Sequence, residues 1–346
     1  MQSLKLICGL MLLDCLAGCL LGCTSPQAVE EITFRSGPFK VVGDLKLPSG
    51  TGPHPVVVFV HGDGPNNRTS SGTYPPIMSR MHRAGYATFA WDKPGTGEST
   101  GEFDRRILFE QRARVLLDAI AVLKNHPALD PDRIGLWGVS QAGYVMPVAL
   151  AQSEDIAFMI AVSCPGEAGI DQTAYLVGAQ ARCEGLSPKD ATHIEQCVAA
   201  VEWAKTYDEY VKHKKVLERY PILAEMGLNM GIRAEENWER NNFDGEYFFD
   251  PMPVIESATI PILAFFGEKD TQVDPYQGMK AYQAALERAG HELSQVVLIS
   301  GVDHNLIISE AGSLKERDRR TARGWQNYPA EYLDLVETWL TEIKGQ

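Results

Sequence analysis

Residues 134–143 read IGLWGVSQAG, an apolar run that passes through Gly138-x-Ser140-x-Ala142-Gly143 into a stretch compatible with a helix. A serine hydroxyl becomes a useful nucleophile when a sharp strand-to-helix turn makes its side chain protrude, and small neighbours let the backbone bend there. Gly138 and Ala142 are small, although the strict motif has glycine where Ala142 stands. The pattern predicts a nucleophile elbow at Ser140, with an ordinary strand-to-helix turn as the competing interpretation.

An earlier apolar run, Pro55–Val60, leads into the glycine-rich sequence His61-Gly-Asp-Gly-Pro. A continuous apolar run is typical of a parallel strand buried on both faces. Backbone N–H groups at a glycine-rich strand end can bind the negative charge that develops on a carbonyl oxygen during acyl transfer. We therefore predict the N–H groups of Asp63 and Gln141 as oxyanion donors, with the Asp63 carboxylate turned away. His61 is expected to brace the loop.

A third strand is predicted at Ile260–Phe266, and an acidic turn follows it. Groups at the carboxyl ends of the strands of an open α/β sheet share one site. We predict Asp270 as the carboxylate partner of a catalytic histidine, with Asp274 and Glu268 as alternatives. A solvated acidic turn is the competing interpretation.

His304 is the histidine best placed to act as a base. It follows the predicted strand Gln295–Ser300, whereas His54 and His291 precede their strands and so belong to the opposite edge of the sheet. The remaining histidines fall in predicted helices or at their ends: His82, His126, His193 and His213.

The chain resembles the α/β-hydrolase family, in the bacterial esterase and dienelactone-hydrolase-like branch that shades into prolyl-oligopeptidase-type peptidases. The order Ser140, Asp270, His304 is the order of this family and differs from that of chymotrypsin and subtilisin. Residues 86–99 add a strand followed by Asp-x-x-Gly-x-Gly-x-Ser, as in the family, with Pro94 where many relatives carry arginine. Read alone, the two glycines suggest a dinucleotide loop, but the third glycine of that motif is missing.

The resemblance implies an α/β-hydrolase fold, in which a mostly parallel sheet is covered by helices on both faces. Residues 30–165 and 252–346 would form the core, and residues 166–251 a helical cap inserted after the sixth strand. Within the cap, residues 188–220 carry apolar side chains at helical spacing, including Trp203. An aromatic cluster either lines the pocket or packs the cap on the core: Trp238, Phe243, Tyr247, Phe248 and Phe249.

The remaining core pattern is that of alternating strands and helices. An antiparallel hairpin is predicted over Glu31–Leu47, turning near Gly37-Pro38. Covering helices are predicted at Pro75–Ala84, Leu108–Asn125, Gln141–Ala151, Tyr276–Ala289 and Ala330–Lys344.

Residues 1–23 are expected to be a signal peptide. The apolar stretch Leu6–Leu21, interrupted by Asp14, is too short for a transmembrane helix but suits a signal core. Sequences resembling lipoboxes end at Cys19 and Cys23. We predict export to the periplasm or cell envelope, with lipidation at Cys23 (Cys19 as the alternative) anchoring the protein to the membrane. A secreted protein is the other possibility.

Composition and the remaining cysteines limit the partners. The formal net charge of −13 argues against nucleic acid and anionic lipid surfaces. Cys183 and Cys197 are expected to be able to pair in an oxidising compartment, and Cys164 to be buried. No metal and no other cofactor is expected, because the region after the leader holds neither Cys-x-x-Cys nor His-Glu-x-x-His.

These residues predict a serine hydrolase that acts on a small-molecule carboxylic ester. His304, oriented by Asp270, would remove the Ser140 proton in a two-step acyl transfer. One fold hosts several such reactions, so a serine peptidase, a thioesterase or a lactonase stays open. A non-catalytic envelope binding protein is disfavoured, because all three triad residues are present.

Overall fold

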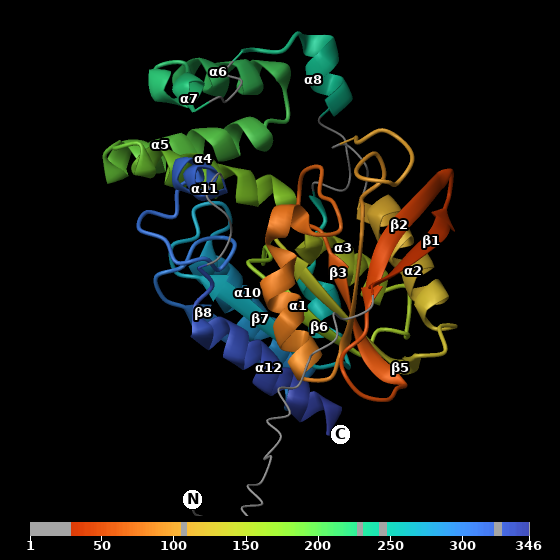
Figure 1. The fold of residues 1–346 in the computed structure, drawn as a ribbon. Helices are drawn as coiled ribbons and strands as arrows, with labels where there is room; N and C mark the ends of the chain where they lie inside the picture. Colours follow the sequence, from red (N-terminus) through yellow and green to blue (C-terminus); the bar gives the residue numbers. More distant parts are fainter. Residues whose placement is uncertain (1–28, 105–108, 227–230, 242–247, 322–326, 346) are drawn as a thin grey trace, which may run out of the picture.

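The computed structural model describes residues 29–104, 109–226, 231–241, 248–321 and 327–345 (Figure 1). In these residues the strands form one sheet of order β1-β2-β4-β3-β5-β6-β7-β8. Strand β2 pairs antiparallel with β1 and with β4, and all other pairings are parallel, which confirms the predicted α/β-hydrolase fold. The strands are β1 (Val29–Ser36), β2 (Phe39–Lys46), β3 (His54–Val60), β4 (Ala87–Trp91), β5 (Leu129–Val139), β6 (Phe158–Val162), β7 (Ile262–Gly267) and β8 (Gln295–Ile299).

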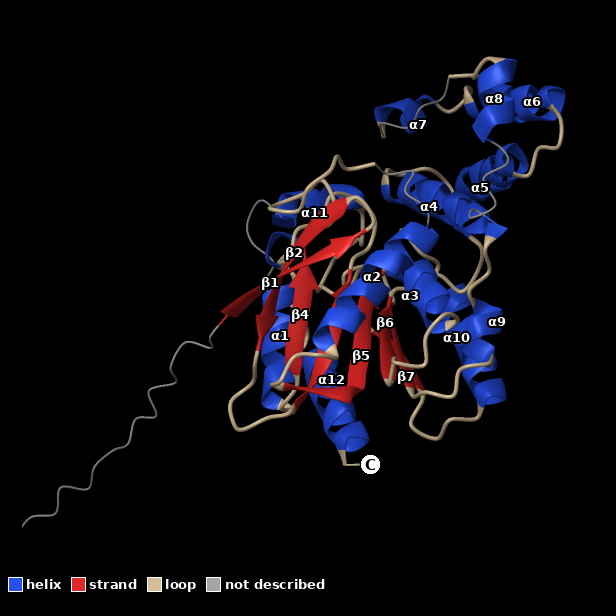
Figure 2. Ribbon diagram, turned by 90° about the vertical axis from the view of Figure 1, so that its right-hand side faces the viewer, coloured by secondary structure: helices blue, strands red, loops and turns tan. Residues whose placement is uncertain are grey.

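Helices cover both faces of the sheet (Figure 2). One face carries α1 (Tyr74–Arg83), preceded by a 3₁₀ turn at Ser70–Gly72, and α12 (Ala330–Lys344). The other face carries α2 (Phe109–Leu123), α3 (Ala142–Leu150), α9 (Met252–Glu256) and α10 (Pro275–Ala289).

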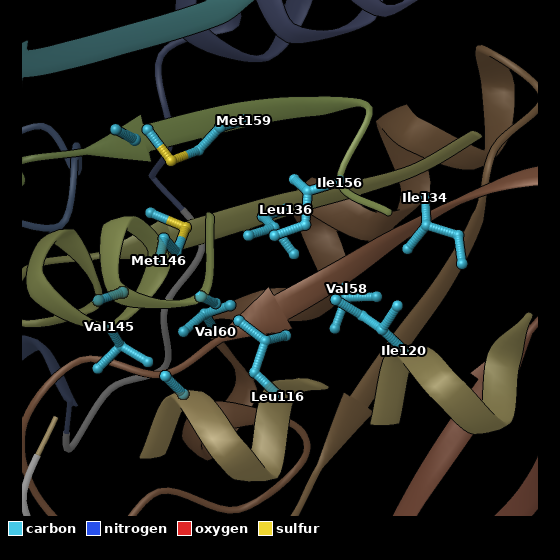
Figure 3. Packing of buried hydrophobic residues seen from close by; sticks show 14 of the residues in the cluster. Val58, Val60, Leu116, Ile120, Ile134, Leu136, Val145, Met146, Ile156 and Met159 are labelled. Atoms are coloured by element: carbon cyan, nitrogen blue, oxygen red, sulfur yellow. The ribbon is translucent and has the colours of Figure 1, made fainter. Parts of the chain in front are cut away.

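Strand β3 shows why the sheet needs unbroken apolar runs. Its Val58 and Val60 side chains belong to one apolar layer with Leu116 and Ile120 of α2 (Figure 3), whereas the neighbouring Val57 and Phe59 belong to the opposite apolar layer with α1 and α12. Successive side chains of a strand point to opposite faces, so a strand covered on both sides has no position at which a polar side chain would reach solvent. Each such fully buried aliphatic side chain contributes about 1.5–3 kcal/mol to folding.

The cap lies between β6 and β7, as the sequence predicted, and stands at one end of the sheet (Figures 1 and 2). The chain leaves the core near Gly166, whose carbonyl oxygen accepts a hydrogen bond from Gln277 of α10 (3.1 Å). It returns through α9, which packs on the same helix. The cap helices are α4 (Gly169–Cys183), α5 (Pro188–Glu202), α6 (Tyr207–Leu217), α7 (Pro221–Glu225) and α8 (Glu235–Asn241).

The expected helical stretch 188–220 is interrupted. Helix α5 ends at Glu202, and Thr206 caps the next helix by accepting a hydrogen bond from the Glu209 N–H (3.2 Å). The placement of Trp203 on the apolar face was therefore wrong: its side chain is 48% exposed, and its indole N–H donates to Asp171 (2.8 Å).

The cysteines of the folded region are free thiols. Cys164 is fully buried, as predicted. The predicted pairing of Cys183 with Cys197 was wrong, because Cys197 lies in the apolar interior of the cap, whereas Cys183 lies at the exposed end of α4. The predicted signal peptide, with Cys19 and Cys23, lies outside the described residues. None of the helices in the described ranges is long and apolar enough to cross a membrane.

Candidate active site

Ser140 occupies a strained turn between β5 and α3. Its φ angle is +59°, a left-handed conformation that is uncommon for residues other than glycine. The Ser140 N–H donates to the Val162 carbonyl (2.9 Å), and its own carbonyl accepts from the Gly143 N–H (2.8 Å). The strand, the turn and the helix thus stand in the arrangement that a nucleophile elbow requires.

Two glycines make room around this turn. A Cβ atom at Gly138 would lie 2.6 Å from the Cβ of Ala142, so the alanine that departs from the strict motif leaves no space for a side chain at position 138. A Cβ atom at Gly62 would lie 3.3 Å from the Cβ of Ser140. The loop after β3 therefore lies directly against the predicted nucleophile.

The structure brings Asp270 and His304 into direct contact. His304 Nδ1 lies 2.7 Å from Asp270 Oδ2, and both residues are buried. The other carboxylate oxygen of Asp270 accepts from the N–H groups of Gln272 (2.7 Å) and Val273 (3.0 Å). The carboxylate is thus held by the backbone and orients the imidazole through Nδ1, which leaves Nε2 for proton transfer.

Ser140 and His304 are not joined by a hydrogen bond in the part of the chain that the structure describes. Catalytic hydrogen bonds are often long until substrate binds, so two side chains without such a bond can still act as base and nucleophile. Ser140 follows β5 and His304 follows β8, so both lie at the carboxyl edge of the sheet.

The two alternative carboxylates have other partners. Asp274 caps α10, accepting from the N–H groups of Tyr276 (3.0 Å) and Gln277 (3.1 Å). Glu268 accepts from the Gly301 N–H (2.8 Å). The geometry therefore favours Asp270 as the partner of the histidine.

His61 braces the loop after β3. Its Nε2 lies 2.6 Å from the Trp91 carbonyl oxygen and its Nδ1 2.7 Å from the Tyr74 hydroxyl. A carbonyl only accepts, so Nε2 carries the proton and Nδ1 accepts from Tyr74. Burial, with the nearby Lys93 ammonium, lowers the pKa of His61 to about 3. The ring therefore stays neutral and has no free nitrogen for proton transfer.

One predicted oxyanion donor, Asp63, belongs to the loop after β3, and the other, Gln141, directly follows Ser140. Asp63 is exposed. Gln141 is the residue before the first turn of α3, where backbone N–H groups have no partner inside the helix. Its side-chain oxygen accepts from the guanidinium of Arg112 on α2.

Sequence analysis did not single out two basic residues of this site, Lys93 and Arg112. Lys93 donates to the carbonyl oxygens of Gly62 (2.6 Å) and Gly64 (2.8 Å). Arg112 donates to those of His61 and Gly62 (3.2 Å to Gly62). The one signal in the sequence is that Lys93 directly follows the strand and aspartate of the Asp-x-x-Gly-x-Gly-x-Ser motif.

A largely apolar cavity lies beside the oxyanion loop and Gln141. Its walls include Phe39, Val60, Trp91, Phe103, Val115 and Val145, with Asp63, Lys93 and Arg112 among the polar lining residues.

The glycines of residues 86–99 let their loop pack closely against a side chain of the same segment. At Gly97, where φ is +51°, an added Cβ would overlap the Asp92 carboxylate. That carboxylate is buried, accepts from the Glu98 N–H (2.9 Å) and pairs with Arg68 (2.8 Å). The loop is therefore folded onto Asp92.

The aromatic cluster of the cap divides. Trp238 is buried against Tyr207 and Tyr210 of α6, with ring centroids 5.9 and 5.8 Å away, so it packs inside the cap. Phe248 is 44% exposed and contacts Trp203. Phe243 and Tyr247 lie outside the described residues.

Comparison with curated proteins finds distant hydrolases. Thiohydrolase aneE of Aspergillus aculeatus is 29% identical over 140 residues, which are 39% of this chain and 43% of that protein. Esterase EstD of Thermotoga maritima is 25% identical over 309 residues, covering 83% of this chain and 63% of the esterase. This chain therefore spans less than two thirds of either relative.

Solved structures share the fold at low identity. The complex of DcsB with its substrate analogue has a TM-score of 0.56 at 16% identity and covers 91% of this chain and 99% of its own. An esterase from Pyrococcus furiosus has a TM-score of 0.54 at 15% identity, with 91% of each chain covered.

One family model spans most of the chain. It is that of the X-Pro dipeptidyl-peptidase (S15 family), and it matches residues 37–305. The matched region contains Ser140, Asp270 and His304. The chain belongs to this S15 family, within the α/β-hydrolase superfamily.

Proposed function

We propose that this protein is a serine hydrolase that cleaves carboxylic esters through Ser140, Asp270 and His304. The observation that carries the proposal is the buried 2.7 Å contact between Asp270 and His304 at the sheet edge where Ser140 sits in its strained turn. A buried carboxylate, an imidazole and a serine at a strand-to-helix turn, in this chain order, are the components of the Ser-His-Asp mechanism of acyl transfer.

The reaction takes two steps. His304 Nε2 accepts the hydroxyl proton while Ser140 Oγ attacks the ester carbonyl, and the N–H groups of Asp63 and Gln141 hold the resulting oxyanion. The intermediate collapses by breaking the bond to the alcohol oxygen, which leaves with the proton from His304. Water, activated by the same imidazole, then releases the acid and restores the serine. Asp270 stabilises the imidazolium in both steps.

The cavity beside the oxyanion loop supports an ester with an apolar acyl group. Phe39, Trp91 and Phe103 supply an apolar lining next to the two predicted donors. The names of two similar proteins, esterase EstD and the Pyrococcus furiosus esterase, point to the same bond.

A second candidate is removal of X-Pro dipeptides from peptide amino termini, which the family match favours. Such a substrate brings a free ammonium group. Glu167, Asp171 and Asp274 lie close enough to one another that the pKa of Glu167 rises to about 7, mainly through burial and then through the two other carboxylates. An ammonium bound there would offset their mutual repulsion.

One experiment separates the two candidates. The wild-type protein and Ser140→Ala are assayed on p-nitrophenyl esters of increasing acyl length and on X-Pro p-nitroanilides. We expect turnover of esters by the wild type and a loss of about a thousandfold or more in Ser140→Ala. Turnover of the anilides alone would replace the ester proposal with the peptidase. Ester turnover that survives in Ser140→Ala would contradict both.

We also propose that the protein is exported and anchored through Cys23. The leader sequence supports this, because Thr24-Ser25-Pro26 resembles a tether behind a lipidated cysteine. In a Gram-negative host the full chain should enter the detergent phase, whereas a Cys23→Ser variant should not. Intact mass identifies the modified residue, and a soluble, unmodified chain would contradict the proposal.

A further inference from the structure

We propose that Lys93 and Arg112 are positioning residues of the oxyanion hole, which aim the N–H of Asp63 at the oxygen of the attacked carbonyl. The proposal rests on the proposed function, because it concerns the same acyl transfer at Ser140. It adds two residues that act through the loop rather than on the substrate.

Lys93 holds the loop from the side of β4. The residue directly follows the motif aspartate, is 9% exposed, and lies 5.8 Å from the ring centre of Phe103. Its ammonium donates to the carbonyl oxygens of Gly62 (2.6 Å) and Gly64 (2.8 Å). Hydrogen bonds from a charged donor are about twice as strong as those between neutral groups. The two bonds therefore fix two peptide planes of the loop.

Arg112 connects the two predicted donors. One nitrogen of its guanidinium donates to the carbonyl oxygens of His61 and Gly62. Another nitrogen donates to the side-chain oxygen of Gln141, the residue that supplies the second N–H. The planar guanidinium is rigid, so it sets the loop after β3 and the start of α3 in a fixed relation.

The peptide group between Gly62 and Asp63 turns these contacts into an orientation. In a planar trans peptide, the carbonyl of one residue and the N–H of the next point in opposite directions. Two cations bind the Gly62 carbonyl, so the Asp63 N–H is directed away from both of them. Gly62 also packs against the Cβ of Ser140, which places this peptide beside the nucleophile.

The positive charges of Lys93 and Arg112 also make the Asp63 N–H a stronger hydrogen-bond donor. A cation on a carbonyl oxygen polarises the amide and makes its N–H a better donor. Lys93 and Arg112 also place two positive charges behind the loop in a partly apolar cavity, where electrostatic interactions are less screened than in water. Burying two cations costs free energy unless they are hydrogen-bonded. Here that cost is offset by hydrogen bonds to the carbonyl oxygens of one short loop, His61 to Gly64.

The test separates transition-state stabilisation from substrate binding. Lys93→Met and Arg112→Met are compared with the wild type by kcat and KM on a p-nitrophenyl ester. Two further readouts are the inhibition constant of a trifluoromethyl ketone, which forms an oxyanion on Ser140, and the rate of fluorophosphonate labelling of Ser140. We expect kcat and the labelling rate to fall by about 10- to 100-fold, with KM changed less than about twofold. The affinity for the ketone should fall in parallel with kcat/KM.

Lys344→Met is the matched control. Lys344 also donates its ammonium to two backbone carbonyls, those of Ala84 (3.3 Å) and Gly85 (3.2 Å), but at the amino end of β4. We expect this variant to lose stability in thermal unfolding and to keep kcat. A fall in kcat of the same size in Lys344→Met would reduce Lys93 to a structural residue and overturn the proposal.

The remaining outcomes are decisive as well. A rise in KM at constant kcat would show that the cations bind substrate, and unchanged labelling rates in folded variants would show that they do not act on the oxyanion. If Lys93→Met does not fold, Lys93→Gln takes its place, because glutamine keeps a hydrogen-bond donor without the charge. We expect Lys93→Gln to lower kcat as well. An unchanged kcat in Lys93→Gln would overturn the role of the charge. If wild-type Ser140 is neither labelled nor active on esters, the proposed function itself has failed.

Discussion

In the core, every strand from β3 to β7 buries side chains on both faces of the sheet, whereas the cap helices gather their apolar residues into a cluster of their own. That cluster contains Ala174, Val177, Ala181, Ile194, Cys197, Val198, Leu217 and Leu223. Polar hydrogen bonds from α4 connect this cluster with the core. The Tyr175 hydroxyl donates to the Asp270 carbonyl (2.7 Å), and the Gln180 amide donates to the Thr271 hydroxyl (2.6 Å).

This difference assigns separate tasks to the two regions. The core builds the elbow from apolar layers and holds Ser140 through the Val162 carbonyl of β6. The cap, in contrast, holds the loop that carries the proposed acid, so its position and that of Asp270 are coupled. Variants in each region should therefore fail in different ways.

The largest effect is expected for Ser140→Ala, which tests the core alone. Ester turnover should fall on the order of a thousandfold or more, because the members of a triad act as a unit. Thermal unfolding should stay within a few degrees of the wild type, since the hydroxyl is not part of the apolar layers. Fluorophosphonate should label the wild type at Ser140, and a label on another serine would move the nucleophile.

The next effect is expected for Asp270→Asn, on the loop that both regions share. Asparagine cannot stabilise the imidazolium, so kcat should fall by about a hundredfold or more. Glu268→Gln is the matched control on the same loop, and it should change kcat by less than about threefold because Glu268 binds the Gly301 N–H. The opposite ranking in steady-state assays would move the acid to Glu268.

Tyr175→Phe tests the coupling between cap and acid loop. Loss of the hydroxyl leaves the Asp270 carbonyl without this donor and should cost about 1 kcal/mol of unfolding free energy. We expect kcat to fall by roughly three- to tenfold, since the orientation of the carboxylate depends on this loop. Tyr220→Phe, which removes a hydroxyl bonded to His193 within the cap, should keep kcat. Equal kcat in both variants would show that the cap does not position the acid.

The smallest effect is expected for Glu167→Gln, between β6 of the core and α4 of the cap. Burial and two neighbouring carboxylates raise the pKa of Glu167 to about 7. The folded state thus favours the protonated carboxyl, so its stabilising contribution is complete below about pH 4.5 and is lost as the pH rises through 7. Glutamine removes that dependence and should stabilise the protein by about 1 kcal/mol at pH 8, after solvent screening, and very little at pH 5. Chemical denaturation at both pH values measures it, and an equal shift at both would contradict the raised pKa.

Sequence alone predicted those parts of the site that follow directly from a strand. Ser140, Asp270 and His304 each come within a few residues of a continuous apolar run, and such runs are the signal by which a doubly covered sheet is recognised. The carboxyl ends of parallel strands share one edge, so the order of the strands placed these residues together without knowledge of any side-chain contact.

Contacts between segments that are distant along the chain could not be predicted from the sequence. Lys93 and Arg112 meet at the Gly62 carbonyl because β4 and α2 both pack beside β3, a relation that no local pattern encodes. In the cap, periodicity placed Trp203 in an apolar stripe, but the helix ends one residue before it. Helix α11 (Leu314–Thr321) was not predicted either, since it is short and strongly polar.

Both ends of the cap segment rest on α10. Gly166 approaches Ala281 so closely that an added Cβ would lie 2.6 Å from the alanine Cβ, and α9 returns the chain to the same helix. A segment whose ends are neighbours can be lengthened, shortened or exchanged while the strands keep their route. The residues between these two contacts can therefore change in length and sequence without altering the route of the strands, provided that the contact of Tyr175 with the Asp270 carbonyl is kept.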